Sequence, residues 1–134
     1  MPLEKAVRPK TAALLIAHGS RVDAANRDLA GLAEGLRARS VYPIVEIGYL
    51  ELTQPTIVDG GIACVRQGAK RVLLLPYFLS AGAHATDDLE RFRSELAAQF
   101  PRVRFILCNP LSLHPLLVDI VIDRLREAEH RETG

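Results

Sequence analysis

Three side chains that can bind a metal or transfer a proton lie just beyond apolar runs of the sequence, and they are His18, Glu51 and His84. Two imidazoles and a carboxylate form a ligand set that suits divalent first-row metals. The same groups can accept or donate protons near neutral pH. Taken singly, a histidine at a strand end is more often an ordinary turn residue, and Glu51 could be a solvated loop residue. The three together indicate a site if the fold gathers them.

The apolar runs before these residues predict strands that would gather them. The runs are short and lack polar alternation, which is typical of strands buried on both faces of a parallel sheet. The predicted strands cover residues 12–17, 44–50, 72–75 and 103–108. Open α/β sheets bind ligands in the crevice beyond the carboxyl ends of their strands. We therefore expect the first strand to deliver His18, the second Glu51, and the loop after the third His84.

Apolar residues recur every three or four positions between the strands and predict helices. The expected helix starts are a capping-box pattern at Ser20, a first turn containing Pro55, an N-cap at Thr86, and a last helix from about Pro115. Alternating strands and helices predict an α/β fold with right-handed crossovers. The expected architecture is a flavodoxin-like sandwich in which helices flank a four-stranded parallel sheet.

The length and composition indicate one domain over residues 1–134, with flexible ends at 1–10 and 130–134. A chain of 134 residues that is 49% hydrophobic can bury about two thirds of its unfolded surface. Its 17 basic and 16 acidic residues are interspersed and tryptophan is absent, so we expect no nucleic-acid partner. Because no apolar run approaches the roughly 20 residues of a membrane span, we also expect no membrane partner.

The cysteines and the N-terminus favour a cytoplasmic protein. Cys64 and Cys108 form neither a CxxC motif nor a disulfide framework, and we interpret them as small buried hydrophobic residues. The charged N-terminus lacks the apolar core of a signal peptide. No glycine-rich phosphate-binding motif follows the first strand. The His18-Gly19 pair also lacks the preceding arginine of the histidine phosphatases, because Ala17 stands there.

Several motifs, in order and spacing, resemble the small sirohydrochlorin chelatases of the CbiX type. They are LLIAHGSR, DAANRDL, GYLELTQPTI, VLLLPYFLSAGAHATDDL and NPLSLHPLL, and they extend from Ala12 to about Leu117. The resemblance implies a chelatase-like fold and a metal site built from His18, Glu51 and His84. One departure is Ala83, which stands where many relatives carry a basic residue.

The reaction that the resemblance implies is ATP-independent insertion of Co²⁺ or Fe²⁺ into sirohydrochlorin, in cobalamin or siroheme biosynthesis. Nickel is a third possible metal. The metal is a substrate here, and no prosthetic group is expected. The substrate carries many carboxylates, which Ser20, Arg21, Gly82 and the helix N-termini beside them could receive. Longer members have two such lobes, so a homodimer is expected, with the last helix as one candidate contact.

Two other functions remain open at this point. A metal-binding or delivery protein would use the same three ligands without converting a tetrapyrrole. A flavodoxin-like interaction module would show neither property, and substituting His18 or His84 in it would change only stability. The choice of metal stays open as well, because histidine and carboxylate ligands suit cobalt, iron and nickel alike.

Overall fold

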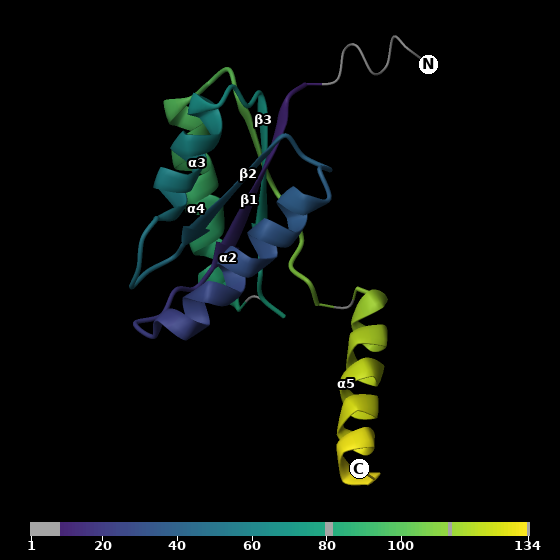
Figure 1. Ribbon diagram of the computed structural model, residues 1–134. Helices are drawn as coiled ribbons and strands as arrows, with labels where there is room; N and C mark the ends of the chain where they lie inside the picture. The colour runs from purple at the N-terminus through teal and green to yellow at the C-terminus, as the bar shows by residue number, and fades with distance from the viewer. Residues whose placement is uncertain (1–8, 80–81, 113, 134) are drawn as a thin grey trace.

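Strands and helices alternate along the chain in the computed structural model, which describes residues 9–79, 82–112 and 114–133 (Figure 1). The strands are β1 (Thr11–Ala17), β2 (Ile44–Tyr49), β3 (Arg71–Pro76) and β4 (Arg104–Leu107). The helices are α2 (Asp23–Ala38), α3 (Ile57–Arg66), α4 (Ala83–Gln99) and α5 (Leu116–Thr133). Every predicted strand is confirmed to within one residue at each end.

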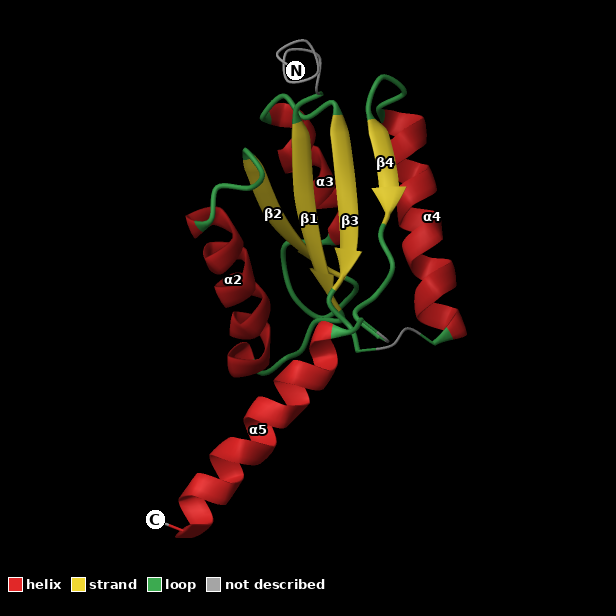
Figure 2. Ribbon diagram, turned by 90° about the vertical axis from the view of Figure 1, so that its right-hand side faces the viewer, coloured by secondary structure: helices red, strands yellow, loops and turns green. Residues whose placement is uncertain are grey.

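The strands form a parallel sheet in the order β2-β1-β3-β4 (Figure 2). Leu14 of β1 stands opposite Glu46 of β2 on one side and Leu74 of β3 on the other. The predicted α/β fold with a four-stranded parallel sheet is therefore confirmed. Since all strands run the same way, their carboxyl ends meet at one edge.

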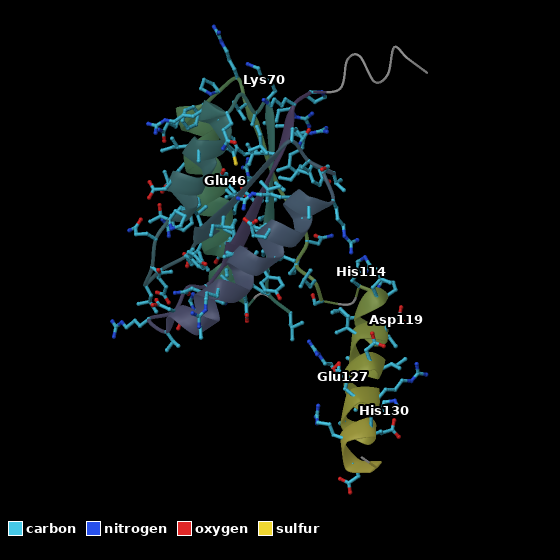
Figure 3. All side chains as sticks on the ribbon, viewed as in Figure 1. Glu46, Lys70, His114, Asp119, Glu127 and His130 are labelled. Carbon is cyan, nitrogen blue, oxygen red and sulfur yellow. The ribbon has the colours of Figure 1, made fainter. Side chains whose placement is uncertain are left out.

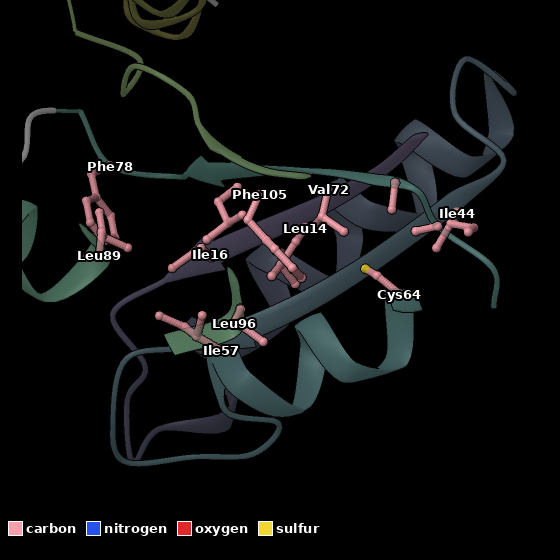
Figure 4. Packing of buried hydrophobic residues seen from close by; sticks show 13 residues of the cluster. Leu14, Ile16, Ile44, Ile57, Cys64, Val72, Phe78, Leu89, Leu96 and Phe105 are labelled. Carbon is pink, nitrogen blue, oxygen red and sulfur yellow. The ribbon is translucent and has the colours of Figure 1, made fainter. Parts of the chain in front are cut away.

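The central strand β1 is buried on both faces, as its unbroken apolar run predicts. Leu14 and Ile16 pack on one face into a cluster with residues of α3 and α4 (Figure 4). Leu15 packs on the other face against Leu29 of α2. Cys64 is fully buried in the first cluster and Cys108 is half-buried, and both are free thiols. The interpretation of Cys64 as a small core residue is confirmed.

The first helix begins three residues after the predicted cap. Its N-cap is Val22, whereas Ser20 lies in the preceding turn and its Oγ accepts the Val22 N–H at 3.0 Å. In the second helix Thr56 is the N-cap and accepts the Asp59 N–H, so Pro55 precedes the helix instead of lying in its first turn. A serine hydroxyl can close a turn as readily as it caps a helix, which is why the pattern misplaces the first of these two starts.

Helix α4 begins one turn earlier than predicted. Its N-cap is Gly82, and Thr86 lies inside the first turn, where its Oγ1 donates to the Gly82 carbonyl oxygen at 3.1 Å. Alanine is the strongest helix former, so Ala83 and Ala85 extend the helix toward β3. His84 therefore stands on the first turn of α4 and not in a loop.

The last helix, α5, projects away from the sheet beyond its carboxyl edge (Figures 1 and 2). Helices α3 and α4 cover one face of the sheet, and α2 covers β1 and β2 on the other. Residues 130–133, for which a flexible end was expected, continue α5. The N-terminal residues 1–8 lie outside the described part of the chain. Among the described helices, none is long and apolar enough to cross a membrane.

Candidate metal site at the carboxyl edge of the sheet

His18 and Glu51 are joined through their backbones just beyond the ends of β1 and β2. The Leu50 N–H donates to the Ala17 carbonyl oxygen, and the Glu51 N–H donates to the His18 carbonyl oxygen, each at 3.0 Å. The backbone hydrogen bonds between β1 and β2 thus continue beyond the last residues of both strands. Backbone hydrogen bonds of this kind set the register of the two neighbouring segments. The His18 and Glu51 side chains therefore leave the backbone at paired positions on the sheet edge.

Gly19 makes this close pairing possible. Its φ is +97°, a conformation that side chains with a Cβ rarely adopt. A Cβ at this position would lie 1.9 Å from the Glu51 carbonyl oxygen, which is well inside van der Waals contact. The glycine is therefore required by both backbone conformation and space.

The imidazole of His18 lies flat against the ring of Phe78. The ring centroids are 4.3 Å apart and the rings are inclined by 17°. Phe78 is buried, and the Tyr77 N–H just before it donates to the Ile16 carbonyl oxygen at 2.7 Å, which ties this segment to β1. The stack contacts the face of the imidazole, whereas metal bonds and protons use nitrogens in the ring plane. Phe78 therefore orients His18 without occupying its reactive atoms.

Asn26 of α2 fastens the turn that follows His18. Its Oδ1 accepts the Ser20 N–H at 2.9 Å, and its Nδ2 donates to the Ser20 carbonyl oxygen at 2.7 Å. The Asn26 carbonyl oxygen accepts the Tyr49 hydroxyl at 2.8 Å. Burial raises the pKa of that hydroxyl above its ordinary value, so it remains a neutral donor. These contacts hold the His18 turn against the end of β2.

His18, Glu51 and His84 line one pocket of about 400 Å³. All three are exposed residues, and each comes from a different element: the ends of β1 and β2, and the first turn of α4. The sequence prediction that these residues converge at the carboxyl edge thus agrees with the pocket lining. The convergence follows from parallel strands and from the early start of α4.

Charged and apolar residues of α4 form another wall of this pocket. Asp88 stands one turn beyond His84, and Arg91 bonds the Asp88 carboxylate at 3.2 Å and lies 3.6 Å from that of Glu95. The Arg91 guanidinium also lies over the Phe92 ring, 4.6 Å from its centroid. Arg91 therefore places a guanidinium in the pocket wall, where it is paired with the carboxylates of Asp88 and Glu95.

Within the described ranges, no three His, Cys, Asp or Glu side chains are placed closely enough to hold a metal ion together. The three predicted ligands share a pocket without forming a coordination shell in this conformation. The predicted substrate-binding residues Ser20, Arg21 and Gly82 stand near this edge but do not line the pocket. Among the described residues, none lies within 4 Å of a Cβ built at Gly82.

The CbiX family model matches residues 12–128. This chain belongs to the CbiX family. It is 42% identical to the sirohydrochlorin cobaltochelatase of Methanocaldococcus jannaschii, over 84% of this chain and 96% of that protein. It is 36% identical to the sirohydrochlorin ferrochelatase of Bacillus subtilis, over 88% of this chain but only 45% of that protein. The CbiX-family chain thus spans nearly the whole of one relative and about half the length of another.

Solved structures agree with this membership. The crystal structure of the sirohydrochlorin chelatase SirB from Bacillus subtilis subspecies spizizenii, in complex with cobalt, superposes with a TM-score of 0.81 at 36% identity. The match covers 88% of this chain and 50% of that one. The CbiX protein of Marinobacter aquaeolei has a TM-score of 0.78 at 26% identity, over 90% of this chain and 98% of that one. These matches confirm the chelatase-like fold.

Sequence reasoning missed several residues of the site in this CbiX-family chain. Phe78 and Asn26 occur in the sequence analysis only inside the quoted motifs VLLLPYFLSAGAHATDDL and DAANRDL, and Arg91 is not singled out there. Asn26 carried one available signal, because a short amide side chain near a helix start often bonds a neighbouring turn. No sequence signal marked Phe78 or Arg91, since their roles depend on which segments meet at the sheet edge.

Proposed function

We propose that this chain inserts a divalent metal, Co²⁺ or Fe²⁺, into sirohydrochlorin. The observation that carries the proposal is that His18, Glu51 and His84 line one pocket at the carboxyl edge of the sheet. The relatives named for this reaction add support, since one matched over nearly its full length is a sirohydrochlorin cobaltochelatase and another is a sirohydrochlorin ferrochelatase. The enzyme would be a chelatase that needs no ATP.

The reaction places clear demands on such a site. Two pyrrole N–H protons must leave, the macrocycle must bend to expose its nitrogen lone pairs, and a partly dehydrated metal must pass to them. A site with three protein ligands and open positions for water serves transfer better than a closed tetrahedral one, because the metal has to leave. The exposed side chains of the pocket meet this demand, since they can approach a metal and release it.

Each residue has a proposed role. His18 and His84 bind the incoming metal, and one of the two also accepts a pyrrole proton. Glu51 acts as the third ligand or as a base. Stacking on Phe78 fixes the plane of the His18 ring. His84 is exposed on the first turn of α4, which leaves its side chain rotamers free to follow the metal.

The substrate's carboxylates require positive or hydrogen-bonding groups around the pocket. We assign this role to Ser20, Arg21 and Gly82, together with the N-terminus of α4, whose first backbone N–H groups lack helical partners. Arg91 adds a guanidinium at the pocket wall. No prosthetic group is part of the proposal, because the metal is itself the substrate.

Two further proposals concern the assembly and its location. A second copy of the chain would supply the missing half of the double-length relatives, which makes a homodimer the proposed assembly. Because Cys64 and Cys108 are both free thiols, we propose a reducing location such as the cytoplasm.

The test is the visible spectrum of sirohydrochlorin under anaerobic conditions, with this protein and Co²⁺, Fe²⁺ or Ni²⁺ in turn. We expect conversion of the free-base bands above the uncatalysed rate, and the fastest metal identifies the preferred substrate. His18→Ala and His84→Ala should each lower the rate by about 100-fold or more, since each removes a ligand or a proton acceptor. His130→Ala is the matched control, because this histidine lies near the end of α5, outside the pocket.

The alternative functions give different results. Equal rates with the native chain, with a double variant that combines His18→Ala and His84→Ala, and without protein would reject chelatase turnover for this substrate. If the native chain then bound Co²⁺ and the double variant did not, metal delivery would replace catalysis as the function. If neither bound metal, the histidines would have only a structural role.

A further inference from the structure

Leu52 adopts a backbone conformation that leucine rarely occupies. Its φ is +69°, and within the described residues Ser40 is the only other residue besides glycine with a positive φ. The Cβ of an L-residue crowds the neighbouring carbonyl in this left-handed region, so a bulky residue there is an outlier. Such outliers persist where the surrounding structure holds them, and they cluster at functional sites. Leu52 directly follows the proposed metal ligand Glu51, so this outlier lies beside the pocket.

The turn at Leu52 holds both polar groups of the Glu51 backbone. The Thr53 N–H donates to the Glu51 carbonyl oxygen at 2.9 Å. A bond that spans one central residue of positive φ is a γ-turn of the rare, strained kind. The same carbonyl oxygen lies against Gly19, where an added Cβ would come within 1.9 Å of it. On the other side, the Glu51 N–H donates to the His18 carbonyl oxygen at 3.0 Å.

The loop that contains this turn is closed at its base. The Tyr49 N–H donates to the Pro55 carbonyl oxygen at 2.9 Å, and Tyr49 also pairs with Thr56 in an isolated bridge. The chain therefore leaves the end of β2 and returns to the same residue over the segment 50–54. Such a short return needs a sharp reversal, and the turn at Leu52 supplies one. The exposed Glu51 side chain thus projects from a backbone that is held at several points.

The Leu52 side chain itself does not explain the turn. It is 52% exposed, belongs to neither core cluster and does not line the pocket. The Glu51 carboxylate, in turn, is not held by any hydrogen bond or ion pair within the described part of the chain. Its position therefore depends on the direction of the Glu51 Cα–Cβ bond, which the held backbone sets.

We propose that the left-handed turn at Leu52 positions Glu51 for the incoming metal. The inference rests on the proposed role of Glu51 as ligand or base, and it adds a residue that acts through Glu51 without touching metal or substrate. The three proposed ligands are then placed in three ways. Phe78 orients His18 by stacking, the first turn of α4 carries His84, and the strained turn fixes the backbone of Glu51.

The first experiment separates the backbone turn from the leucine side chain. Leu52→Asn removes the apolar side chain but tolerates a positive φ, whereas Leu52→Val stays apolar and resists it, because valine is β-branched. Calorimetry measures Co²⁺ affinity, and the visible spectrum measures sirohydrochlorin conversion. We expect Leu52→Asn to stay within about twofold of the native chain and Leu52→Val to lower both by about 10- to 100-fold, as for residues that orient a metal ligand. The reverse order, or equal values for the two variants, would overturn the proposal.

The second experiment tests whether the turn acts through Glu51. Leu52→Val is combined with Glu51→Gln, and Co²⁺ affinity is measured for the two single variants and the double variant. We expect Leu52→Val to weaken binding in the native chain but to add little once Glu51→Gln is present, since the group that it positions is gone. Losses that multiply would mean that the turn supports only the fold. A Glu51→Gln chain with native Co²⁺ affinity would overturn the proposal as well, because no metal-binding role would remain to position.

Two matched controls lie outside the pocket. Ser40 has a φ of +54° between α2 and β2, at the opposite edge of the sheet. Ser40→Val should lower the urea midpoint, as Leu52→Val does, without changing Co²⁺ affinity. Glu46, labelled in Figure 3, lies on β2, and its carboxylate accepts a hydrogen bond from Gln67 Nε2 at 2.8 Å. Glu46→Gln should therefore keep the native Co²⁺ affinity. A loss of affinity in Ser40→Val equal to that in Leu52→Val would attribute the effect to instability and overturn the proposal.

The Co²⁺ measurements also separate this inference from the proposed reaction. A chain that shows the expected Co²⁺ affinities but converts no sirohydrochlorin would keep the positioning role and reject the chelatase function. An active chain whose rate and Co²⁺ affinity are unchanged by Leu52→Val would keep the function and reject the positioning role.

Discussion

The Glu51 N–H donates to the His18 carbonyl oxygen at 3.0 Å, so two of the proposed ligands leave the sheet from one continuous backbone ladder. Their spacing is set by main-chain geometry and not by side-chain packing alone. Phe78 then orients the His18 ring, and α4 brings His84 to the same pocket. The site therefore depends on residues that would never touch the metal.

Gly19→Ala should damage the site and the fold together. The added Cβ would meet the Glu51 carbonyl oxygen in a backbone conformation that alanine rarely adopts. We expect a loss of about 2 kcal/mol or more in the free energy of unfolding, together with a large loss of activity, because the paired edge must move. Urea denaturation measures the first effect and the sirohydrochlorin assay the second.

Gly31→Ala is the control for this prediction. Gly31 lies on an exposed part of α2, and a Cβ there meets nothing within 4 Å. Alanine in a helix interior stabilises by about 0.5 to 1 kcal/mol relative to glycine. Equal stability changes at the two positions would contradict the role given to Gly19.

Phe78→Leu should weaken metal binding more than it weakens the fold. Leucine has an apolar volume similar to that of phenylalanine, so the loss in the free energy of unfolding should stay at about 1.5 kcal/mol. The flat ring that supports His18 is removed. We expect a lower rate of metal insertion and a shift of the His18 ring protons in NMR spectra, since the aromatic ring current disappears. Phe105→Leu, equally buried but away from His18, should reproduce the stability loss without either effect.

Arg91→Ala should raise the KM for sirohydrochlorin while leaving kcat nearly unchanged. Arg91 lines the pocket but stands apart from the proposed ligands, so it would serve substrate carboxylates and not the metal. Its ion pairs with Asp88 and Glu95 are about half exposed, and such pairs contribute at most about 1 kcal/mol to stability. Arg66→Ala on α3 is the control. A fall in kcat at constant KM would contradict this assignment.

The two thiols should react with alkylating agents at different rates. Burial raises the pKa of Cys64 to about 12, with the nearby Glu46 carboxylate adding to the effect, and burial also raises the pKa of Cys108. Only the thiolate reacts, so at pH 8 about one Cys64 thiol in 10⁴ is reactive, and the fraction rises about tenfold per pH unit below the pKa. Mass spectrometry after iodoacetamide treatment should show modification of Cys64 only when urea unfolds the chain. Rapid labelling of Cys64 in the native chain would contradict its burial.

The sheet and the residues with reactive side chains could be predicted from the amino-acid sequence. Short apolar runs without alternation can be satisfied only by strands covered on both faces, and β1 shows this at Leu14 and Leu15, which pack against different helices. Parallel strands deliver their following residues to one edge. This rule alone placed His18 and Glu51 together before any contact was known.

Helix starts were less predictable, because hydroxyl side chains serve turns and caps equally well. Ser20 closes a turn before α2, and Thr86 lies within α4, so His84 moved from a predicted loop onto a helix. A local pattern cannot choose between these uses, since the choice depends on where the neighbouring strand ends. The tertiary structure decides whether each hydroxyl closes a turn or caps a helix.

The tertiary structure alone decided the contacts between distant segments. The stacking of Phe78 on His18 joins residues 60 positions apart, and no periodicity in the sequence encodes such a contact. The same holds for α5, whose apolar pattern fits packing on a sheet or on another molecule. Its sequence predicts an apolar side that packs against protein, whereas only the tertiary structure shows that α5 projects away from the sheet (Figure 2), because that direction depends on how the segment after β4 leaves the sheet edge.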